Sequence, residues 1–227
     1  MTDSPKPFHI VFLLFDGITQ LDFTGPAQFL ARMPGAIVHT AAKQVKPIET
    51  DSGFAILPNT DFIGCPQADL LCVPGGFGTK DVIADPETLR FLRDQAEGAR
   101  YITSVCTGSL ALGAAGLLKG KRATSHWAYT ALLEKFGATF VKARVVKDGN
   151  VITAGGVTSG IDFALTVIAE IAGREFAESV QLGLEYNPQP PFKGGHPDTA
   201  DPKLVTLLQD RVYGKQAADL ADIIDRR

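Results

Sequence analysis

The feature that most constrains the fold is a series of short, continuous apolar runs separated by helix-like segments. Residues 9–15 (HIVFLLF) are too few for a buried helix, and they lack the alternation of a strand with one solvated face. Residues 36–42, 69–73 and 101–105 also suit buried strands. Strands that alternate with helices build a parallel sheet covered on both faces. The sequence therefore predicts an α/β sandwich with a mostly parallel central sheet and helices on both faces.

Local signals predict where several other elements begin and end. Thr24 is a candidate N-cap for the first helix, and Asp85 caps a helix that starts at Pro86 and runs to about Gly98. The remaining expected elements are a hairpin at 46–57, a short strand at 122–124, a helix at 128–136, a strand pair formed by 139–147 and 151–154, helices at 161–172 and 177–184, and a final amphipathic helix, or two, marked by Leu204, Leu208 and Val212.

Cys106 stands where the strand at 101–105 meets an uncharged run of small residues and leucines. Ser104 and Gly108 flank it at two positions on either side, and this small-residue pattern is what a nucleophile elbow requires. A thiol at a helix N-terminus is expected to ionise more readily, because the positive end of the helix dipole favours the thiolate. The alternative is an ordinary buried cysteine before a core helix.

Three loops are expected to meet at one edge of the sheet, because ligands of parallel sheets bind at the carboxyl ends of the strands. These loops carry Asp22, the Gly75–Gly76 pair and the Cys106 elbow. Asp22 has apolar neighbours in sequence, so burial and a nearby thiolate would raise its pKa and let the two groups share one proton. The alternative is a turn or helix-capping aspartate. The Thr107 N–H is the expected oxyanion donor of an elbow, and Gly75 or Gly76 is expected to supply a second.

The four histidines differ in whether the sequence places them near the expected site. His9 and His39 lie in or beside predicted strands and are expected to be structural. His126 ends a short strand twenty residues after Cys106, so it could come near the site. It either takes a direct catalytic role or is only a supporting or structural hydrogen-bonding residue. His196 and Asp198 resemble the His-x-acid pair of cysteine amidohydrolases, although they lie in an irregular segment.

Charge and cysteine usage exclude several classes of protein. The net charge is −3 and the basic residues are scattered, which is not the pattern of a nucleic-acid-binding surface. No leader or membrane-spanning run is recognised. Cys65, Cys72 and Cys106 are too few for a disulfide framework, and no set of residues has zinc-ligand spacing. We therefore expect a cytoplasmic protein with no metal, no membrane contact and no nucleic-acid partner.

Three motifs together resemble the ThiJ/PfpI superfamily. They are residues 73–76 (VPGG), 104–110 (SVCTGSL) and 122–127 (RATSHW). The resemblance covers about residues 8–185 and implies a flavodoxin-like fold of the class I glutamine amidotransferase type, usually as a homodimer. On this basis the whole chain, 1–227, is expected to be a single domain, in which an irregular segment at 187–202 and a C-terminal helical segment at 203–227 follow the core.

A narrower resemblance points to the isocyanide hydratases of that superfamily. Many superfamily members place a glutamate in the first loop, whereas residues 20–26 (QLDFTGP) here carry Asp22. This loop is similar to that of isocyanide hydratases, as are residues 106–109 (CTGS), 155–158 (GGVT), 160–165 (GIDFAL) and the 181–186 segment. The resemblance implies that Cys106 is the nucleophile, Asp22 the general acid/base and Thr107 a supporting residue.

The implied reaction adds water to an isocyanide and yields an N-substituted formamide, without a cofactor, through a thioimidate on Cys106. Gly75, Gly76 and Val157 are then expected to contact the substrate or an oxyanion, with His126 as a more distant support. The loops that should line the substrate site carry the apolar side chains of Phe77, Trp127, Val157 and Phe192.

Three rival functions are considered, of which the enzyme and the redox sensor remain open. A glyoxalase-like or amidase-like enzyme would use the same fold, but Asp22 in place of the commoner glutamate argues against it. Regulator members continue into an AraC-type helix-turn-helix pair, for which the forty residues after Asn187 are too few. A redox sensor would need only a reactive Cys106.

Overall fold

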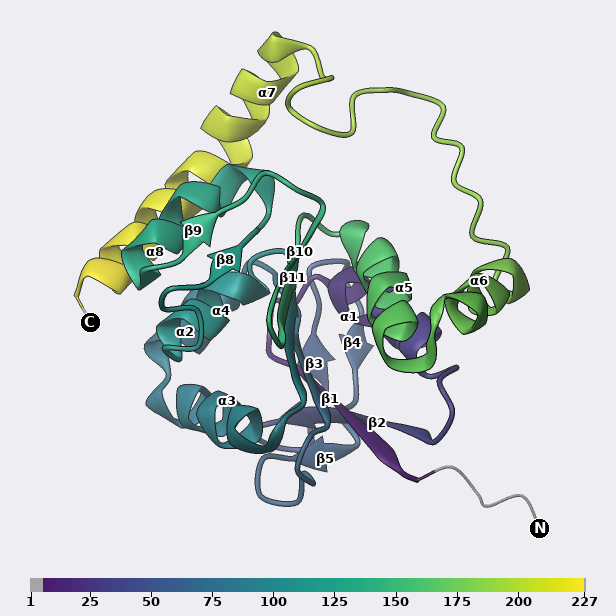
Figure 1. The fold of residues 1–227 in the computed structure, drawn as a ribbon. Helices are drawn as coiled ribbons and strands as arrows, with labels where there is room; N and C mark the ends of the chain where they lie inside the picture. The colour runs from purple at the N-terminus through teal and green to yellow at the C-terminus, as the bar shows by residue number, and fades with distance from the viewer. Residues whose placement is uncertain (1–5, 227) are drawn as a thin grey trace.

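A seven-stranded sheet lies at the centre of the structure, a computed structural model that describes residues 6–226 (Figure 1). The strand order is β10-β11-β7-β6-β1-β2-β5, and β10 alone of these seven runs antiparallel to its neighbour. The strands are β1 (Phe8–Leu13), β2 (Ala36–Ala42), β5 (Thr60–Asp61), β6 (Leu70–Val73), β7 (Tyr101–Val105), β10 (Val145–Asp148) and β11 (Val151–Ala154). The predicted mostly parallel sheet is confirmed.

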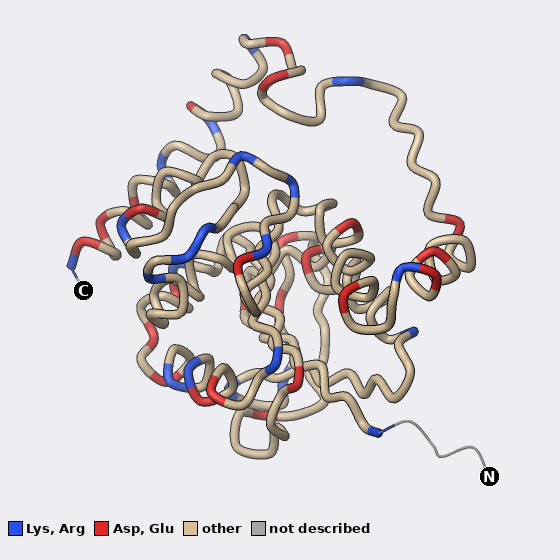
Figure 2. The backbone as a smooth tube through the Cα atoms, in the orientation of Figure 1, with Lys and Arg blue, Asp and Glu red and all other residues tan. Residues whose placement is uncertain are grey.

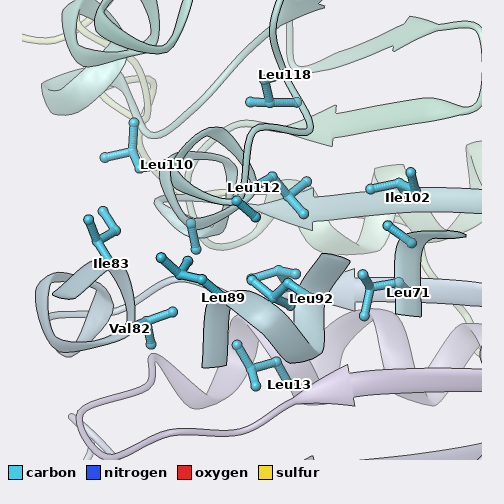
Figure 3. Packing of buried hydrophobic residues seen from close by; sticks show 14 of the residues in the cluster. Leu13, Leu71, Val82, Ile83, Leu89, Leu92, Ile102, Leu110, Leu112 and Leu118 are labelled. Atoms are coloured by element: carbon cyan, nitrogen blue, oxygen red, sulfur yellow. The ribbon is translucent and has the colours of Figure 1, made fainter. Parts of the chain in front are cut away.

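The central strand β1 shows why a continuous apolar run was required. Its side chains alternate between the two faces of the sheet, so both sets need apolar residues. Val11 and Leu13 pack into one hydrophobic cluster, whereas Ile10 and Phe12 pack into the other, and all four are fully buried. Figure 3 shows Leu13 among the leucines of the first cluster.

Helices cover both faces, as the sequence predicted. The helices that contribute to the first cluster are α2 (Thr79–Ala84), α3 (Pro86–Gly98), α4 (Gly108–Ala114), the 3₁₀ helix η1 (Trp127–Phe136) and α8 (Gly214–Asp225). The helices that contribute to the second are α1 (Gln20–Leu30), α5 (Ser159–Ala172) and α6 (Arg174–Gly183). Each helix layer therefore buries one face of the sheet.

The two predicted helix caps have different outcomes. Asp85 caps α3 as expected, because its side chain accepts a hydrogen bond of 3.1 Å from the Thr88 N–H. Thr24 does not cap α1, which already begins at Gln20. The Thr24 hydroxyl instead donates to Oε1 of Gln20 at 2.7 Å, within the helix. Asp22 consequently lies in the first turn of α1 and not in a preceding loop.

Three other expectations about local structure differ in detail from the structure. Within residues 139–147, only β10 pairs with β11, whereas β9 (Thr139–Phe140) pairs in parallel with β8 (Arg122–Ala123). The expected hairpin at 46–57 is confirmed but contains only two short strands, β3 (Ile48–Glu49) and β4 (Ala55–Ile56). The expected helix at 128–136 is a 3₁₀ helix.

The C-terminal segment consists of α7 (Pro202–Leu208), a π-helix η2 (Gln209–Tyr213) and α8. The predicted apolar stripe does not face the core, since α7 buries no side chain and Leu204 is 46% exposed. Leu220 and Ile224 of α8 make the buried contacts instead. The irregular segment that precedes α7 extends away from the body of the fold in Figure 1.

The chain order within the sheet brings the predicted loops together. The chain passes from β1 to β2 on one side, and β6 then returns to the other side of β1. The neighbouring strands β1, β6 and β7 run parallel, so their carboxyl ends open at one edge, at the switch point where ligands bind in such sheets. The three predicted segments converge at this edge, although Asp22 is carried by the first turn of α1 and not by a loop.

Figure 2 shows Lys and Arg interspersed with Asp and Glu along the chain. Within residues 6–226, no helix combines the length and apolar character needed to cross a membrane.

Candidate active site

Cys106 occupies a strained backbone position between β7 and α4. Its φ of 57° lies in the left-handed region, which residues with a Cβ seldom adopt. Four hydrogen bonds hold it there. The Cys106 N–H is shared between the carbonyls of Ala154 at 3.1 Å and Gly155 at 2.8 Å. The Cys106 carbonyl accepts from the hydroxyls of Ser109 at 3.2 Å and Ser125 at 3.0 Å.

The residues around the elbow are small because neighbouring chains leave no room. A Cβ at Gly108 would lie 1.9 Å from the carbonyl oxygen of Val73, a distance that no real side chain tolerates. Ser104, on the other side of the cysteine, is fully buried. The predicted sharp strand-to-helix turn at Cys106 is therefore confirmed.

Asp22 is fully buried beside this turn. Its Oδ2 accepts a hydrogen bond of 2.9 Å from the Gly75 N–H, which links α1 to the loop after β6. Oδ1 has no hydrogen-bond partner of regular geometry among the residues that the structure describes. Burial raises the pKa of Asp22 to about 7, although hydrogen bonds from Gly75 and Cys106 oppose that shift.

The pKa of the Cys106 thiol is raised well above its ordinary value, first by burial and then by the negative charge of Asp22. Hydrogen bonds from the Thr107 and Val157 N–H groups act in the opposite direction. The expected thiolate at neutral pH is therefore wrong for the resting site. Helix α4 has only seven residues, and its N-terminus does not offset burial next to a carboxylate. The thiol and the carboxyl titrate as a pair.

The loop after β6 uses its N–H groups internally. The Gly75 N–H is taken by Asp22, and the Gly76 N–H donates to Oγ1 of Thr107 at 3.0 Å. Thr107 Oγ1 also lies 2.8 Å from the Thr79 hydroxyl. The expectation of an oxyanion donor at Gly75 or Gly76 is therefore wrong, because neither group is free to donate to a ligand.

A cavity of about 120 Å³ opens next to Cys106. Among the residues predicted to contact substrate, Gly76, Phe77, Thr107, His126 and Val157 line it. Gly75 lies behind it, against Asp22. Trp127 instead lines a wider outer cleft of about 1020 Å³, and Phe192 is 82% exposed outside both.

Five residues that line the cavity were missed by sequence reasoning. They are Thr19, Asp51, Tyr129, Tyr213 and Gln216. The Thr19 hydroxyl, just before α1, donates a hydrogen bond of 2.6 Å to Oδ2 of Asp51. No local pattern marks these residues, because each reaches the cavity only through the tertiary fold.

The histidines play different structural parts. Burial lowers the pKa of His126 to about 4, so its ring is neutral, and its Nδ1 accepts from the Ala128 N–H at 3.3 Å to cap η1. His9 and His39 are joined ring to ring at 2.9 Å on neighbouring strands. His196 lies near Asp198 but lines the outer cleft and not the cavity of Cys106.

The site therefore combines a thiol, a carboxyl that shares its proton, and two N–H groups directed at the sulfur. Among residues 6–226, no group of three or more His, Cys, Asp or Glu side chains has an arrangement that would hold a metal ion. The arrangement suits covalent chemistry in which the sulfur attacks a small electrophile and the carboxyl moves a proton.

The chain is similar in sequence or in fold to several known proteins. Isonitrile hydratase of Pseudomonas putida is 55% identical over 202 residues, which cover 89% of each chain. The crystal structure of a ThiJ/PfpI family protein from Pseudomonas syringae has a TM-score of 0.92 and 43% identity, and the match covers 96% of this chain and 92% of that one. The HTH-type transcriptional regulator GbdR of Pseudomonas aeruginosa is 30% identical over 77% of this chain, which spans half of the regulator.

The DJ-1/PfpI family matches residues 8–170. The resemblance stated from the motifs, and the flavodoxin-like fold that it implied, are confirmed by this match and by the similar crystal structure. The chain belongs to the DJ-1/PfpI family.

Proposed function

We propose that this protein is an isocyanide hydratase, which adds water to R–N≡C and releases the N-substituted formamide. One observation carries the proposal. Asp22, whose pKa is about 7, shares a buried site with the Cys106 thiol at the edge of a small cavity. The name of the Pseudomonas putida relative supports the same reaction.

The shared proton suits the unusual demand of an isocyanide. Its terminal carbon must gain both a nucleophile and a proton. As Cys106 sulfur bonds to that carbon, the proton of the pair passes through Asp22 to the same carbon, and a thioimidate, R–N=CH–S–Cys, forms. Thr107 and Val157 donate backbone N–H groups toward the sulfur and stabilise its negative charge during the attack.

Hydrolysis of the thioimidate returns the site to its starting state. The Asp22 carboxylate accepts a proton from water as the water oxygen bonds to the imidate carbon, and it passes that proton to the nitrogen. Asp22 then accepts the proton of the new hydroxyl group as the tetrahedral adduct R–NH–CH(OH)–S–Cys expels Cys106 sulfur, which leaves R–NH–CHO. The thiolate regains a proton from Asp22, and atoms balance with water as the only other reactant. The chain's own residues thus supply every group that the reaction needs.

The cavity limits the size of the substrate. Pockets for drug-sized ligands measure roughly 300–1,000 Å³. The cavity at Cys106 measures about 120 Å³, so the reacting end of the substrate must be small. A linear isocyanide group with a modest substituent meets that requirement.

Other features of the proposal come from the resemblance and from the whole-chain expectations. The enzyme acts as a homodimer in the cytoplasm, and residues 1–227 form a single domain with its core at about 8–185. Thr107 supports the site through its hydroxyl, which fixes the Gly76 N–H.

The test is formamide production from a simple alkyl isocyanide such as cyclohexyl isocyanide, followed by mass spectrometry. Wild type is expected to turn over, Cys106→Ala to lose all enzymatic formamide production, and Cys65→Ala to match wild type, since Cys65 does not line the cavity. If wild type produces no formamide from any isocyanide, the proposal is wrong, and aldehydes and peroxide become the next substrates to test.

A further inference from the structure

Two residues of the C-terminal segment line the cavity of Cys106, although they lie far from it in the sequence. Tyr213 ends the π-helix η2, and Gln216 belongs to the first turn of α8. The DJ-1/PfpI match ends at residue 170, so both lie outside the part of the chain that carries the family pattern. The site is thus closed by a segment that the family core does not include.

The ring of Tyr213 packs against three aromatic side chains near the cavity. Its centroid lies 4.9 Å from that of His126, 5.4 Å from that of Trp127 and 5.9 Å from that of Tyr129. The last two contacts are edge-to-face, an arrangement that fixes ring orientation. Burial raises the pKa of Tyr213, with a further contribution from the nearby Cys106 sulfur, so its hydroxyl stays protonated.

Gln216 ties α8 to two walls of the cavity. Its Oε1 accepts a hydrogen bond from the Tyr129 hydroxyl, and its Nε2 donates to the Phe77 carbonyl at 3.3 Å. Phe77 follows the glycine loop after β6, whereas Tyr129 belongs to η1. One side chain therefore connects three elements around the opening.

The π-helix sets the direction in which this segment faces. A π turn contains an additional residue, which rotates the following helix by roughly 100° relative to a regular one. Before this turn α7 buries no side chain, and after it α8 buries Leu220 and Ile224. A Cβ at Gly214 would lie 2.7 Å from the Gln209 carbonyl oxygen, so the residue after Tyr213 must be small. The wide turn thus orients Tyr213 and Gln216 toward the cavity.

We propose that η2 and α8 form the selective wall of the substrate site, and that Tyr213 and Gln216 determine which isocyanide substituents are accepted. This inference rests on the proposed isocyanide hydratase activity. The rings of His126, Tyr129 and Tyr213 offer apolar faces, whereas Asp51 lines the same cavity and repels anions. The wall therefore favours compact substituents over bulky ones, and Asp51, which lies outside the wall, disfavours anionic ones.

The test compares kcat/KM for a small linear alkyl isocyanide and a bulky tertiary one. In Tyr213→Ala the bulky-to-small ratio is expected to rise about tenfold, because pockets discriminate by roughly 10–200-fold per methylene. Tyr213→Phe keeps the ring and should retain the wild-type ratio. Val212→Ala is the matched control, since Val212 is the neighbouring residue but is 40% exposed and does not line the cavity.

Gln216→Ala opens the same wall without removing an aromatic contact. It therefore still tests the inference if Tyr213→Ala fails to fold. It is expected to raise the ratio in the same direction. If wild type turns over both isocyanides and neither Tyr213→Ala nor Gln216→Ala changes the ratio by more than twofold, the inference is overturned.

A second readout separates this inference from the proposed function. Cys106 is alkylated with iodoacetamide or with the bulkier N-phenylmaleimide, and peptide mass spectrometry locates the adduct. Tyr213→Ala should raise the relative rate of the bulky reagent at least fivefold, and Val212→Ala should not. This result without any isocyanide turnover would reject the proposed function but retain the selective wall. Turnover with an unchanged labelling ratio would reject the wall.

Discussion

The loop after β6 and the turn after β11 are both glycine-rich and both lie against Cys106, but their N–H groups point to different partners. In the loop after β6, Gly75 and Gly76 donate to the side chains of Asp22 and Thr107. In the turn after β11, the Val157 N–H is directed at the Cys106 sulfur. The first loop therefore positions the proton carrier, and the second stabilises charge on the nucleophile.

The two regions also differ in what surrounds their glycines. A Cβ at Gly75 would lie 2.5 Å from the backbone nitrogen of Thr107 and 3.0 Å from Oδ2 of Asp22. A Cβ at Gly156 would lie 2.7 Å from a ring carbon of His126, which is a side chain. Backbone cannot move aside as a side chain can, so the loop after β6 is the less tolerant of the two. Similar composition therefore supports two distinct tasks.

Apart from the loss of Cys106 itself, the largest effect is expected for Asp22→Asn. The amide oxygen still accepts the Gly75 N–H, but the side chain no longer transfers a proton. General acid/base catalysis is worth about 10²–10⁴ in rate, so kcat/KM for formamide formation should fall by that factor. Asp81→Asn, at an exposed position in α2, is the matched control. A loss of less than threefold in Asp22→Asn would remove Asp22 from the mechanism.

Gly75→Ala and Gly156→Ala test the difference between the two regions directly. Displacement of a catalytic group by 1 Å can reduce the rate about 10²-fold, and Gly75→Ala should do so by moving Asp22 and Thr107. Gly156→Ala should have a smaller effect, because the added methyl group meets the His126 ring and not Asp22 or the backbone of Thr107. Steady-state kinetics and melting temperatures for both variants provide the comparison, and a reversed order would contradict it.

The pH profile should report the shared proton. Below a pH of about 7, both Asp22 and Cys106 are protonated, so no carboxylate is present to accept the thiol proton. We expect kcat/KM to fall about tenfold for each pH unit below that value, and to fall again only in alkaline solution. A wild-type profile that is flat between pH 5 and pH 7 would contradict the paired titration.

Stability should respond to pH in the opposite direction. The pKa of Asp22 is 3.8 when unperturbed and about 7 in the folded protein, so the folded state binds the extra proton. Its stabilising contribution is complete below the unfolded value and is lost as the pH rises through the folded value. Asp22→Asn should therefore become progressively more stable than wild type between pH 4 and pH 7, in urea unfolding. If the stability of the two proteins changed with pH in parallel, the raised pKa of the buried Asp22 carboxyl would be contradicted.

The smallest effect is expected for a change at Arg144, whose hydrogen bonds hold the turn after β11. The Arg144 carbonyl accepts from the Gly155 N–H at 2.9 Å, its Nη2 donates to Thr158 at 3.2 Å, and its Nε pairs with Asp162. Arg144→Lys keeps the charge but loses this fork of donors. Exposed ion pairs are worth up to about 1 kcal/mol, so kcat should fall about fivefold or less. A loss as large as that of Gly75→Ala would abolish the distinction between the two regions.

Sequence reasoning succeeded where a physical requirement leaves a local trace. Strands buried on both faces require continuous apolar runs, and β1 has one. A strand that turns sharply into a helix requires small neighbours, and Gly108 meets that requirement. Asp22 was found because an isolated carboxyl among apolar residues, after a central strand, points to a buried acid.

It failed where tertiary contacts decide the outcome. Thr24 looks like a helix cap, but α1 begins one turn earlier. Nothing in the sequence shows that the Gly75 and Gly76 N–H groups face protein side chains and not a ligand. Gln216 lies 139 residues from Phe77 in sequence, although the two are hydrogen-bonded. Burial of the thiol next to the Asp22 carboxyl raises its pKa more than the helix N-terminus lowers it. The motif around Cys106 shows neither the burial nor the position of Asp22.

The most direct measurement of the central claim is the mass of Cys106 during turnover. Wild type is mixed with an isocyanide, quenched in acid within milliseconds and digested. The mass of the peptide that carries Cys106 is then measured by mass spectrometry. The shared-proton mechanism predicts a gain equal to the whole isocyanide, because the thioimidate contains every atom of the substrate. Formamide production by wild type with no such gain, at rates that Cys106→Ala reproduces, would show that the sulfur is not the nucleophile.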